Sequence, residues 1–287
     1  MKRTLFLAVL AYGLSSLPLP AAQAEGSFDK ILNVSGAVDL DVQTGSGHIT
    51  VRAGNASTVS IHGIIHVREN WRGSKSAEQK VREIESNPPI QQTGNVVRIG
   101  HLEDPELRRN VSIAYEITTP AESKARLNTG SGGVTIEGIR GPVNATTGSG
   151  GMNISQVAGD VRAHTGSGRI ELDSVQGTVD AHTGSGSIEG SRVSGKIIAD
   201  TGSGHVRLEQ TVGGDIDAHT GSGGITIRTP AQAAFDLRAH TGSGHIDVQR
   251  PMTVRGTIGP RDLEAKVGGG GSTIVAARTG SGTIRIE

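Results

Sequence analysis

One tetrapeptide recurs along the chain at a nearly constant spacing, and this spacing constrains the fold more than any other feature. Thr-Gly-Ser-Gly occurs nine times in 287 residues. Its copies begin at Thr44, Thr129, Thr147, Thr165, Thr183, Thr201, Thr220, Thr241 and Thr279. From Thr129 to Thr201 every interval is 18 residues, and the next two intervals are 19 and 21 residues. A repeat of this length is typical of a solenoid, in which each repeat is one coil stacked on its neighbours.

Each repeat contains two short stretches in which apolar and polar residues alternate. In the repeat that begins at Thr165, Ile170 and Leu172 alternate with charged residues, and Val179 and Ala181 alternate with polar ones. A period of two predicts a strand with one buried face. Glycines separate the two stretches and predict the corners of a coil, because glycine adopts tight turn conformations without steric cost.

Aligned repeats place the same kind of side chain at the same position. The residue two before the motif is alanine in seven of the nine repeats. This small-residue column comprises Ala145, Ala163, Ala181, Ala199, Ala218, Ala239 and Ala277. Strands stacked in register about 4.8 Å apart produce such columns. The sequence therefore predicts an all-β fold, a single-stranded parallel β-solenoid (β-helix) with about 18 residues per coil, in which each coil pairs with the next one along the chain.

The motif itself is interpreted as a structural corner. It does not resemble a phosphate-binding loop, because it lacks the lysine and the following helix that such a loop needs. The alternation along the strand turns its threonine inward, where the hydroxyl can form a hydrogen bond at the corner. The predicted corner residues are Thr129, Gly130, Ser131, Gly132, Thr147, Gly148, Gly150, Thr165, Gly166, Gly168, Thr183, Gly184 and Gly186.

The first 24 residues have the features of a secretory signal peptide. Lys2 and Arg3 form a basic start, an apolar stretch follows, and residues 22–24 form a small-x-small cleavage site. The apolar stretch is too short to span a bilayer as a stable helix, and no second such run follows. We therefore expect an exported protein, in the periplasm, at the cell surface or secreted, with no transmembrane segment in the mature chain.

Residues 25–287 are expected to form one domain whose first part is irregular. Residues 25–120 contain strand patterns and an insertion over residues 67–110, whereas residues 121–287 form the regular coils. Within the insertion, Ser76 and Gln79 form a capping box, and Ala77, Val81 and Ile84 share one helical face. These signals predict a short helix over residues 76–86 that covers an end or a flank of the solenoid.

Charge and cysteine content exclude several classes of function. Residues 25–287 keep all 28 acidic residues but lose two of the 28 basic ones with the signal peptide, so their net charge is −2. A nucleic-acid partner would require a basic excess, so none is expected. The absence of cysteine excludes disulfide and thiolate chemistry. No cofactor is expected.

The residues also resemble a known family. The combination of a signal peptide, the stretch from Val111 to Pro120 and the repeated T-G-S-G-x-I-x-I units is similar to the bacterial "putative adhesin" family, a domain of unknown function with β-strand repeats. Residues 266–274, before the last motif, are similar to the closing coils of that family. The resemblance covers residues 28–287 and implies a parallel β-solenoid at the cell envelope. It implies no catalytic residues.

A column of histidines is the most unusual chemical feature. His164, His182, His219 and His240 each precede the motif on their own coil, with Asp200 in the same column. Alternation with the inward alanines points these side chains outward. Imidazoles on adjacent coils are suitable ligands for zinc or copper, so these five residues are the candidate metal ligands. The alternative is a solvated column copied by repeat duplication.

Together these observations favour a non-enzymatic, exported binding or scaffold protein of the adhesin type. Its partner would be an envelope polymer, another protein or a host surface, held by many weak contacts along a repetitive face. Two alternatives remain open. One is a β-helix enzyme acting on polysaccharide, although outward residues such as Glu171, Glu189 and Arg207 do not form an evident catalytic set. The other is a metal- or pH-responsive module that uses the histidine column.

Overall fold

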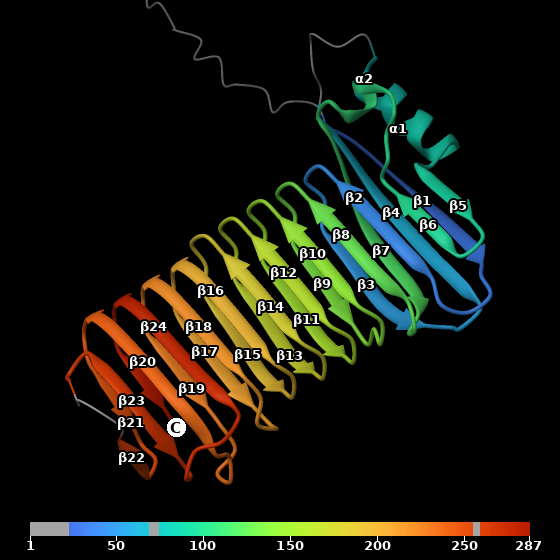
Figure 1. Cartoon of the computed structure of the whole chain (residues 1–287). Coiled ribbons are helices and arrows are strands. Elements are labelled where there is room, and N and C mark those ends of the chain that lie inside the picture. Colours follow the sequence, from blue (N-terminus) through green and yellow to red (C-terminus); the bar gives the residue numbers. More distant parts are fainter. Residues whose placement is uncertain (1–22, 69–74, 255–258) are drawn as a thin grey trace, which may run out of the picture.

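The computed structural model describes residues 23–68, 75–254 and 259–287 (Figure 1). Residues 1–22 of the predicted signal peptide lie outside this part of the chain, and residues 23 and 24 belong to the first strand. The described residues form an elongated stack of two sheets, with two short helices at one end (Figure 1). The predicted all-β class with mostly parallel strands is confirmed.

We call the two sheets A and B. In spatial order, sheet A contains β1 (Gln23–Asn33), β4 (Thr58–Arg68), β7 (Val111–Pro120), β3 (Ile49–Gly54), β9 (Val134–Glu137), β11 (Met152–Val157), β13 (Ile170–Val175), β15 (Ile188–Val193), β17 (Val206–Gln210), β19 (Ile225–Arg228), β25 (Ile284–Ile286) and β21 (Ile246–Val248). Sheet B contains β22 (Met252–Val254), β23 (Asp262–Val267), β20 (Phe235–Ser243), β24 (Ile274–Ser281), β18 (Ile216–Ser222), β16 (Ile197–Ser203), β14 (Val179–Thr183), β12 (Val161–Thr165), β10 (Val143–Thr147), β8 (Lys124–Thr129), β2 (Asp39–Thr44), β6 (Val96–Ile99) and β5 (Ile90–Thr93).

In the middle of the stack, parallel strands pair so that equivalent repeat positions lie side by side. In sheet B, Ala163 pairs with Ala145 on one side and with Ala181 on the other. In sheet A, Ile170 pairs in the same way with Met152 and Ile188. Every residue of the alanine column is buried. The core is therefore a thin layer of small and aliphatic side chains between the sheets, and each buried Val or Ile contributes about 1.5–3 kcal/mol relative to exposure.

The first end of the stack departs from the predicted order of coils. β2 pairs with β8 and β6, and β3 pairs with β9 and β7, all in parallel. The coil made of β6 and β7 therefore lies nearer to the end of the stack than the coil made of β2 and β3, although β6 and β7 come later in the sequence. β4 then pairs antiparallel with both β7 and β1, so that sheet A ends in antiparallel strands.

The other end shows the same kind of rearrangement. β24 pairs with β18 on one side and with β20 on the other, so Thr279 lies between Thr220 and Thr241. The expectation that each coil pairs with the next one along the chain is therefore wrong at both ends. β20 continues into antiparallel pairing with β23, which pairs antiparallel with β22. At each end, a coil from within the chain covers the coil nearer to the terminus.

The predicted helix is confirmed as α1 (Ala77–Ser86), with Ser76 as N-cap and both capping-box bonds to Gln79 present. Its apolar face is buried, and the backbone N–H of Ser27 in β1 donates to Glu85 Oε1 at 3.1 Å. A carboxylate thus occupies part of the open edge of sheet A, which limits pairing with other chains. The second helix, α2 (Pro105–Arg108), is a single turn before β7. Neither helix is long and apolar enough to cross a membrane, and the described residues contain no other.

Candidate functional site

The motif threonines lie at the corners, and their hydroxyls join consecutive coils. Thr165 Oγ1 donates to the carbonyl of Gly150 at 2.9 Å and accepts from the backbone N–H of Gly168 at 3.1 Å. Thr129, Thr147 and Thr183 make the equivalent pairs of bonds. These side chains are buried and hydrogen-bonded, so they belong to the scaffold and have no hydroxyl free for a ligand.

The motif glycines are required by the close approach of the coils. A Cβ added at Gly168 would lie 1.8 Å from the carbonyl oxygen of Gly150, and one at Gly166 would lie 2.4 Å from that of Gly148. Such distances leave no room for a side chain. The same close approach recurs at Gly130, Gly132, Gly148, Gly150, Gly184 and Gly186. Ser131 between them is exposed.

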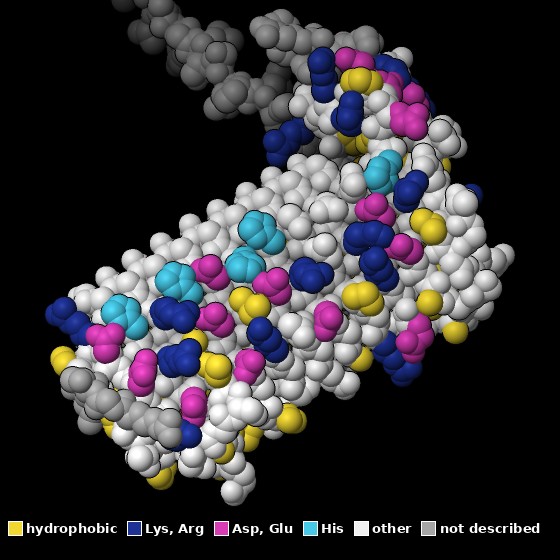
Figure 2. Space-filling model, viewed as in Figure 1, with side chains coloured by type: hydrophobic (Ala, Val, Ile, Leu, Met, Phe, Trp, Pro, Cys, Tyr) yellow, Lys and Arg dark blue, Asp and Glu magenta, His cyan; other side chains and the backbone are white. Residues whose placement is uncertain are grey.

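The histidine column lies on the outer face of sheet B, among acidic and basic side chains (Figure 2). Only His164 and His182 are direct neighbours, with ring centroids 6.4 Å apart. Asp200 separates His182 from His219. Because β24 lies between β18 and β20, an arginine separates His219 from His240. The four histidines are therefore not a continuous row.

Carboxylates bond to two of the imidazoles. His182 Nε2 lies 2.7 Å from Asp180 Oδ1, and His240 Nδ1 lies 2.5 Å from Asp262 Oδ1. Within the described residues, no group of three or more His, Cys, Asp or Glu side chains is placed to hold a metal ion.

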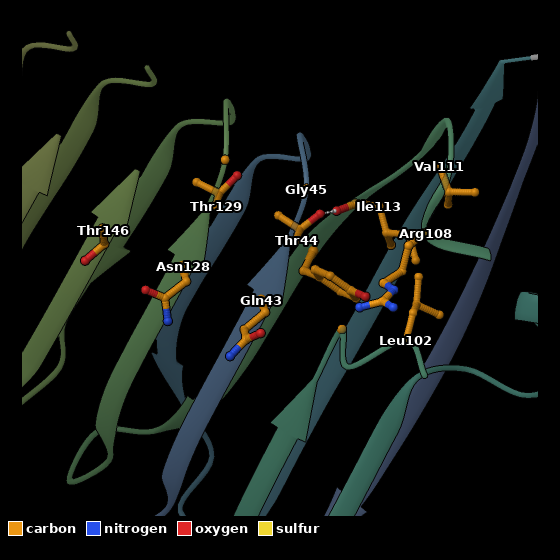
Figure 3. A pocket seen from close by; sticks show the side chains of 13 residues that line it. Gln43, Thr44, Gly45, Leu102, Arg108, Val111, Ile113, Asn128, Thr129 and Thr146 are labelled. Atoms are coloured by element: carbon orange, nitrogen blue, oxygen red, sulfur yellow. Dashed lines mark hydrogen bonds between the residues drawn. The ribbon is translucent and has the colours of Figure 1, made fainter. Parts of the chain in front are cut away.

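A cavity of about 320 Å³ lies where the first coils meet the insertion (Figure 3). One wall comes from the outer face of sheet B, where Gln43, Asn128 and Thr146 lie on the neighbouring strands β2, β8 and β10. The opposite wall comes from Leu102 and Arg108, which precede β7 (Figure 3). Because the second wall belongs to the insertion, this hollow occurs at one end of the stack and is not repeated on every coil.

The wall at Gly100 depends on the absence of a side chain. Its φ is +85°, in the left-handed region, and an added Cβ would lie 1.7 Å from the carbonyl oxygen of Gln43. Glycine tolerates both conditions. The chain after β6 therefore passes directly against the end of β2, and Leu102 can close the side of the cavity.

Tyr115 contributes an unsatisfied polar atom to the cavity wall. Its side chain is 1% exposed, and its hydroxyl has no hydrogen-bond partner. Phe28 packs against its ring with 6.4 Å between centroids. Burial raises the pKa of the Tyr115 hydroxyl, so the group is a neutral donor and acceptor at all physiological pH values. A buried polar group without a partner costs about 1–3 kcal/mol, which a bound ligand would offset.

Among the described residues that line the cavity, Arg108 supplies the only charge. The lining contains no acidic residue, and among the described residues no partner engages the guanidinium of Arg108. Most other arginines near the sheets are paired, as Arg126 is with Asp39 at 2.8 Å. An unpaired arginine beside an unsatisfied hydroxyl makes this cavity the candidate binding site.

Sequence reasoning did not identify this site. Tyr115 belongs to the stretch from Val111 to Pro120 that carries the family resemblance and is one of four aromatic residues after residue 24, but neither fact predicts a site, and Arg108 lies in an insertion without repeat pattern. A useful signal was the presence of a tyrosine in a chain that has only two. A large ring in a core built from alanine and valine requires a local reason.

The sequence model of the Toastrack DUF4097 family matches residues 19–287. The chain belongs to this family. The resemblance to a bacterial adhesin-like family of unknown function is therefore confirmed. Among proteins with curated descriptions, none matches this Toastrack chain.

Several crystal structures are similar to this Toastrack chain. A putative adhesin from Bacteroides fragilis is 13% identical, with 91% of this chain and 97% of that chain covered and a TM-score of 0.49. A putative cell adhesion protein from Clostridium sporogenes is 12% identical, with 92% and 99% covered and a TM-score of 0.30. A putative adhesin from Parabacteroides distasonis is 9% identical, with 91% and 97% covered and a TM-score of 0.34.

Proposed function

We propose that this Toastrack chain is an exported, non-enzymatic binding protein of the cell envelope, of the adhesin or scaffold type. We further infer that its two sheets are the faces of a β-solenoid wound from a single chain with about 18 residues per coil. The observation that carries the proposal is the column of outward polar side chains along sheet B. This outer column runs in register through Gln43, Asn128, Thr146, His164, His182, Asp200, His219, Arg278 and His240.

The outer column suits an extended partner. Neighbouring positions repeat about every 4.8 Å, so a linear polymer or an extended peptide can make one contact per coil. Each contact is exposed and weak, but several contacts to one partner combine through effective concentration. The rigid, hydrogen-bonded corners keep the contacts at fixed spacing, which lowers the entropy that binding loses.

The carboxylates on the outer face of sheet A support a non-enzymatic role. Arg169 lies 3.2 Å from Glu171 and 3.8 Å from Glu189, and Arg207 lies 3.9 Å from Glu189. A general acid or base on a polysaccharide enzyme needs a carboxyl that is free to exchange a proton with substrate. Here these carboxylates form an exposed network of ion pairs.

A comparison of the two sheet faces tests the binding role. One variant carries alanine in place of Thr146, His164, His182 and His219 on sheet B. The matched control carries alanine in place of Thr135, Asn153, Arg207 and Thr226 on sheet A. We expect the sheet B variant to sediment with isolated cell envelopes about tenfold more weakly, because several contacts are lost together. Equal binding by both variants, or no binding by the parent protein, would contradict the proposal.

A protection experiment tests the location. Added protease is expected to digest a tagged copy on intact cells if it lies on the surface, and only after outer-layer permeabilisation if it lies in the periplasm. Protection until complete lysis would show that the chain is not exported.

A further inference from the structure

We propose that the cavity beside Tyr115 binds a carboxylate-bearing sugar unit, and that it holds one residue of an acidic polysaccharide whose chain continues along the outer column. This inference rests on the proposed binding role, since it names the partner class for one end of the same face. It is carried by four features of the cavity: its charge, its unsatisfied hydroxyl, its mixed lining and its position.

The charge of the lining favours a single negative charge on the ligand. Arg108 is the only charged lining residue, and its guanidinium is unpaired among the described residues. A guanidinium binds a carboxylate through two parallel N–H···O bonds. The single positive charge of Arg108 neutralises the single negative charge of a carboxylate. A phosphate monoester carries about two negative charges, and one of them would remain without a cation in this lining.

Tyr115 adds a hydrogen-bond donor at a fixed place. Tyr115 lines the cavity, and its hydroxyl, which is buried without a partner, would lie 3.3 Å from a Cβ at Gly100. The surrounding core holds the ring, so the hydroxyl loses little entropy when it bonds to a ligand. It can donate to a sugar oxygen and accept from a sugar hydroxyl.

The rest of the lining suits a hydroxyl-rich ring. The amides of Gln43 and Asn128 and the hydroxyl of Thr146 offer donors and acceptors, and no side-chain partner among the described residues occupies them. Leu102 and Ile113 provide apolar surface for the carbon–hydrogen face of a ring. The volume of about 320 Å³ is at the small end for ligand sites, as a single sugar unit requires.

The position of the cavity connects it to the outer column. Gln43, Asn128 and Thr146 are its first three members, and Thr146 pairs directly with His164 on the next strand. A sugar unit in the cavity therefore has a path for its neighbours across His164 and His182. The imidazoles along that path can donate hydrogen bonds to further sugar units.

Titration calorimetry with defined sugars tests the proposal. Glucuronate is expected to bind the parent protein measurably, galactose at the same concentration much more weakly, and a glucuronate-containing oligomer more tightly than the monosaccharide. Arg108→Gln is expected to weaken glucuronate binding about tenfold or more. Tyr115→Phe is expected to weaken binding about fivefold without lowering the melting temperature, because it removes only an unsatisfied hydroxyl. Arg109→Gln is the matched control, since Arg109 is a neighbour on the same turn that pairs with Glu106 at 3.3 Å outside the cavity.

Several results would overturn the inference. Equal affinity for glucuronate, acetate and inorganic phosphate would show an unspecific anion site. An equal effect of Arg108→Gln and Arg109→Gln would show attraction by general surface charge. If the parent protein sediments with envelopes but does not bind glucuronate, the sugar site is excluded while the binding role stands. If the protein binds neither, both proposals fail.

Discussion

At the scale of single residues, the second glycine of the motif determines how closely the coils stack. Its Cα lies against the carbonyl of the equivalent glycine on the preceding coil, and the threonine of the same motif, three residues earlier, donates its hydroxyl to that same carbonyl. One carbonyl thus receives a bond from the next coil and excludes any side chain there. The four-residue motif is conserved from coil to coil within this chain because both requirements recur on each one.

Replacing Gly168 by alanine tests this explanation. The new Cβ would lie 1.8 Å from the carbonyl of Gly150, so two backbones must separate. We expect the free energy of unfolding to fall by about 3 kcal/mol. Urea denaturation measures the change. Gly151→Ala is the control, because its Cβ would lie 3.4 Å from the nearest atom, an ordinary contact. A similar loss in both variants would mean that glycine content, rather than coil contact, determines stability.

The same scale shows what sequence alone can predict. Alternation and column position correctly predicted that the alanines are buried and that His164 and His182 point outward on neighbouring strands. The left-handed backbone of Gln156, Ser174 and Arg192 was not predicted. These residues occupy one column at the other corner, whose first member, Gly138, has a φ of +78°. On the following coils the column carries no glycine, and stacking between coils imposes the conformation.

At the scale of elements, two lysines, one in α1 and one just before its N-cap, hold the parts of the insertion together. Lys75 Nζ donates to Glu83 at 2.7 Å and to Asp104 at 2.9 Å. Lys80, which is 2% exposed, donates to the carbonyl of Arg109 at 3.0 Å. These bonds join α1 to the segment that carries Arg108, so the helix positions one wall of the cavity.

Acid is expected to loosen this connection. The hydrogen bond from Lys75, helped by the backbone N–H of Glu106, lowers the pKa of Asp104 below its ordinary value of 3.8. A lowered folded-state pKa stabilises the fold above the unfolded value, and this stabilisation is lost as the pH falls through the folded value. We expect the carboxyl carbon of Asp104 to titrate below pH 3.8 in an NMR experiment, and Lys75→Met to move that transition upward. Lys30→Met should leave it unchanged, and a shift of equal size there would refute the local cause.

The repeat pattern does not predict the order in which the strands pair at the two ends of the stack. Thr220, Thr241 and Thr279 carry the same corner chemistry, and each donates to the carbonyl of a motif glycine on a neighbouring coil. Equivalent corners can stack in any order, so the motif does not reveal which coil is the neighbour of which. Antiparallel strands such as β22 and β23, which carry no copy of the motif, occupy one edge of β20 and leave its other edge to β24.

At the scale of the whole molecule, β24 and β2 lie inside sheet B although other strands are farther from the chain ends, whereas β1 forms an outer edge of sheet A. β24 pairs on both sides, with β18 and with β20, and β2 pairs with β8 and β6. In a solenoid that ends with its last coil, the terminal repeat has one neighbour and opens first. Here the outermost positions of sheet B are filled by β22 and β5, from within the chain, and those of sheet A by β1 and β21.

Hydrogen exchange tests the consequence for local opening. We expect the amides of β24 to exchange as slowly as those of β16 in the middle of sheet B, and those of β22 to exchange faster. Two-dimensional NMR after transfer to deuterated water gives the rates. Protection that decreases steadily from the middle of the stack to residue 287 would contradict the enclosed position of β24.

The enclosed position of β24 and β25 also bears on how the protein is made. A polypeptide synthesised from its N-terminus delivers residues 274–287 only after β18 to β21 are already outside the ribosome. Until then the strands on either side of the missing coil have unpaired edges, which can pair with each other or with other molecules. A product that lacks residues 274–287 would therefore lose a layer from inside the stack. The strands on either side of the missing layer would be unpaired and accessible to cellular proteases.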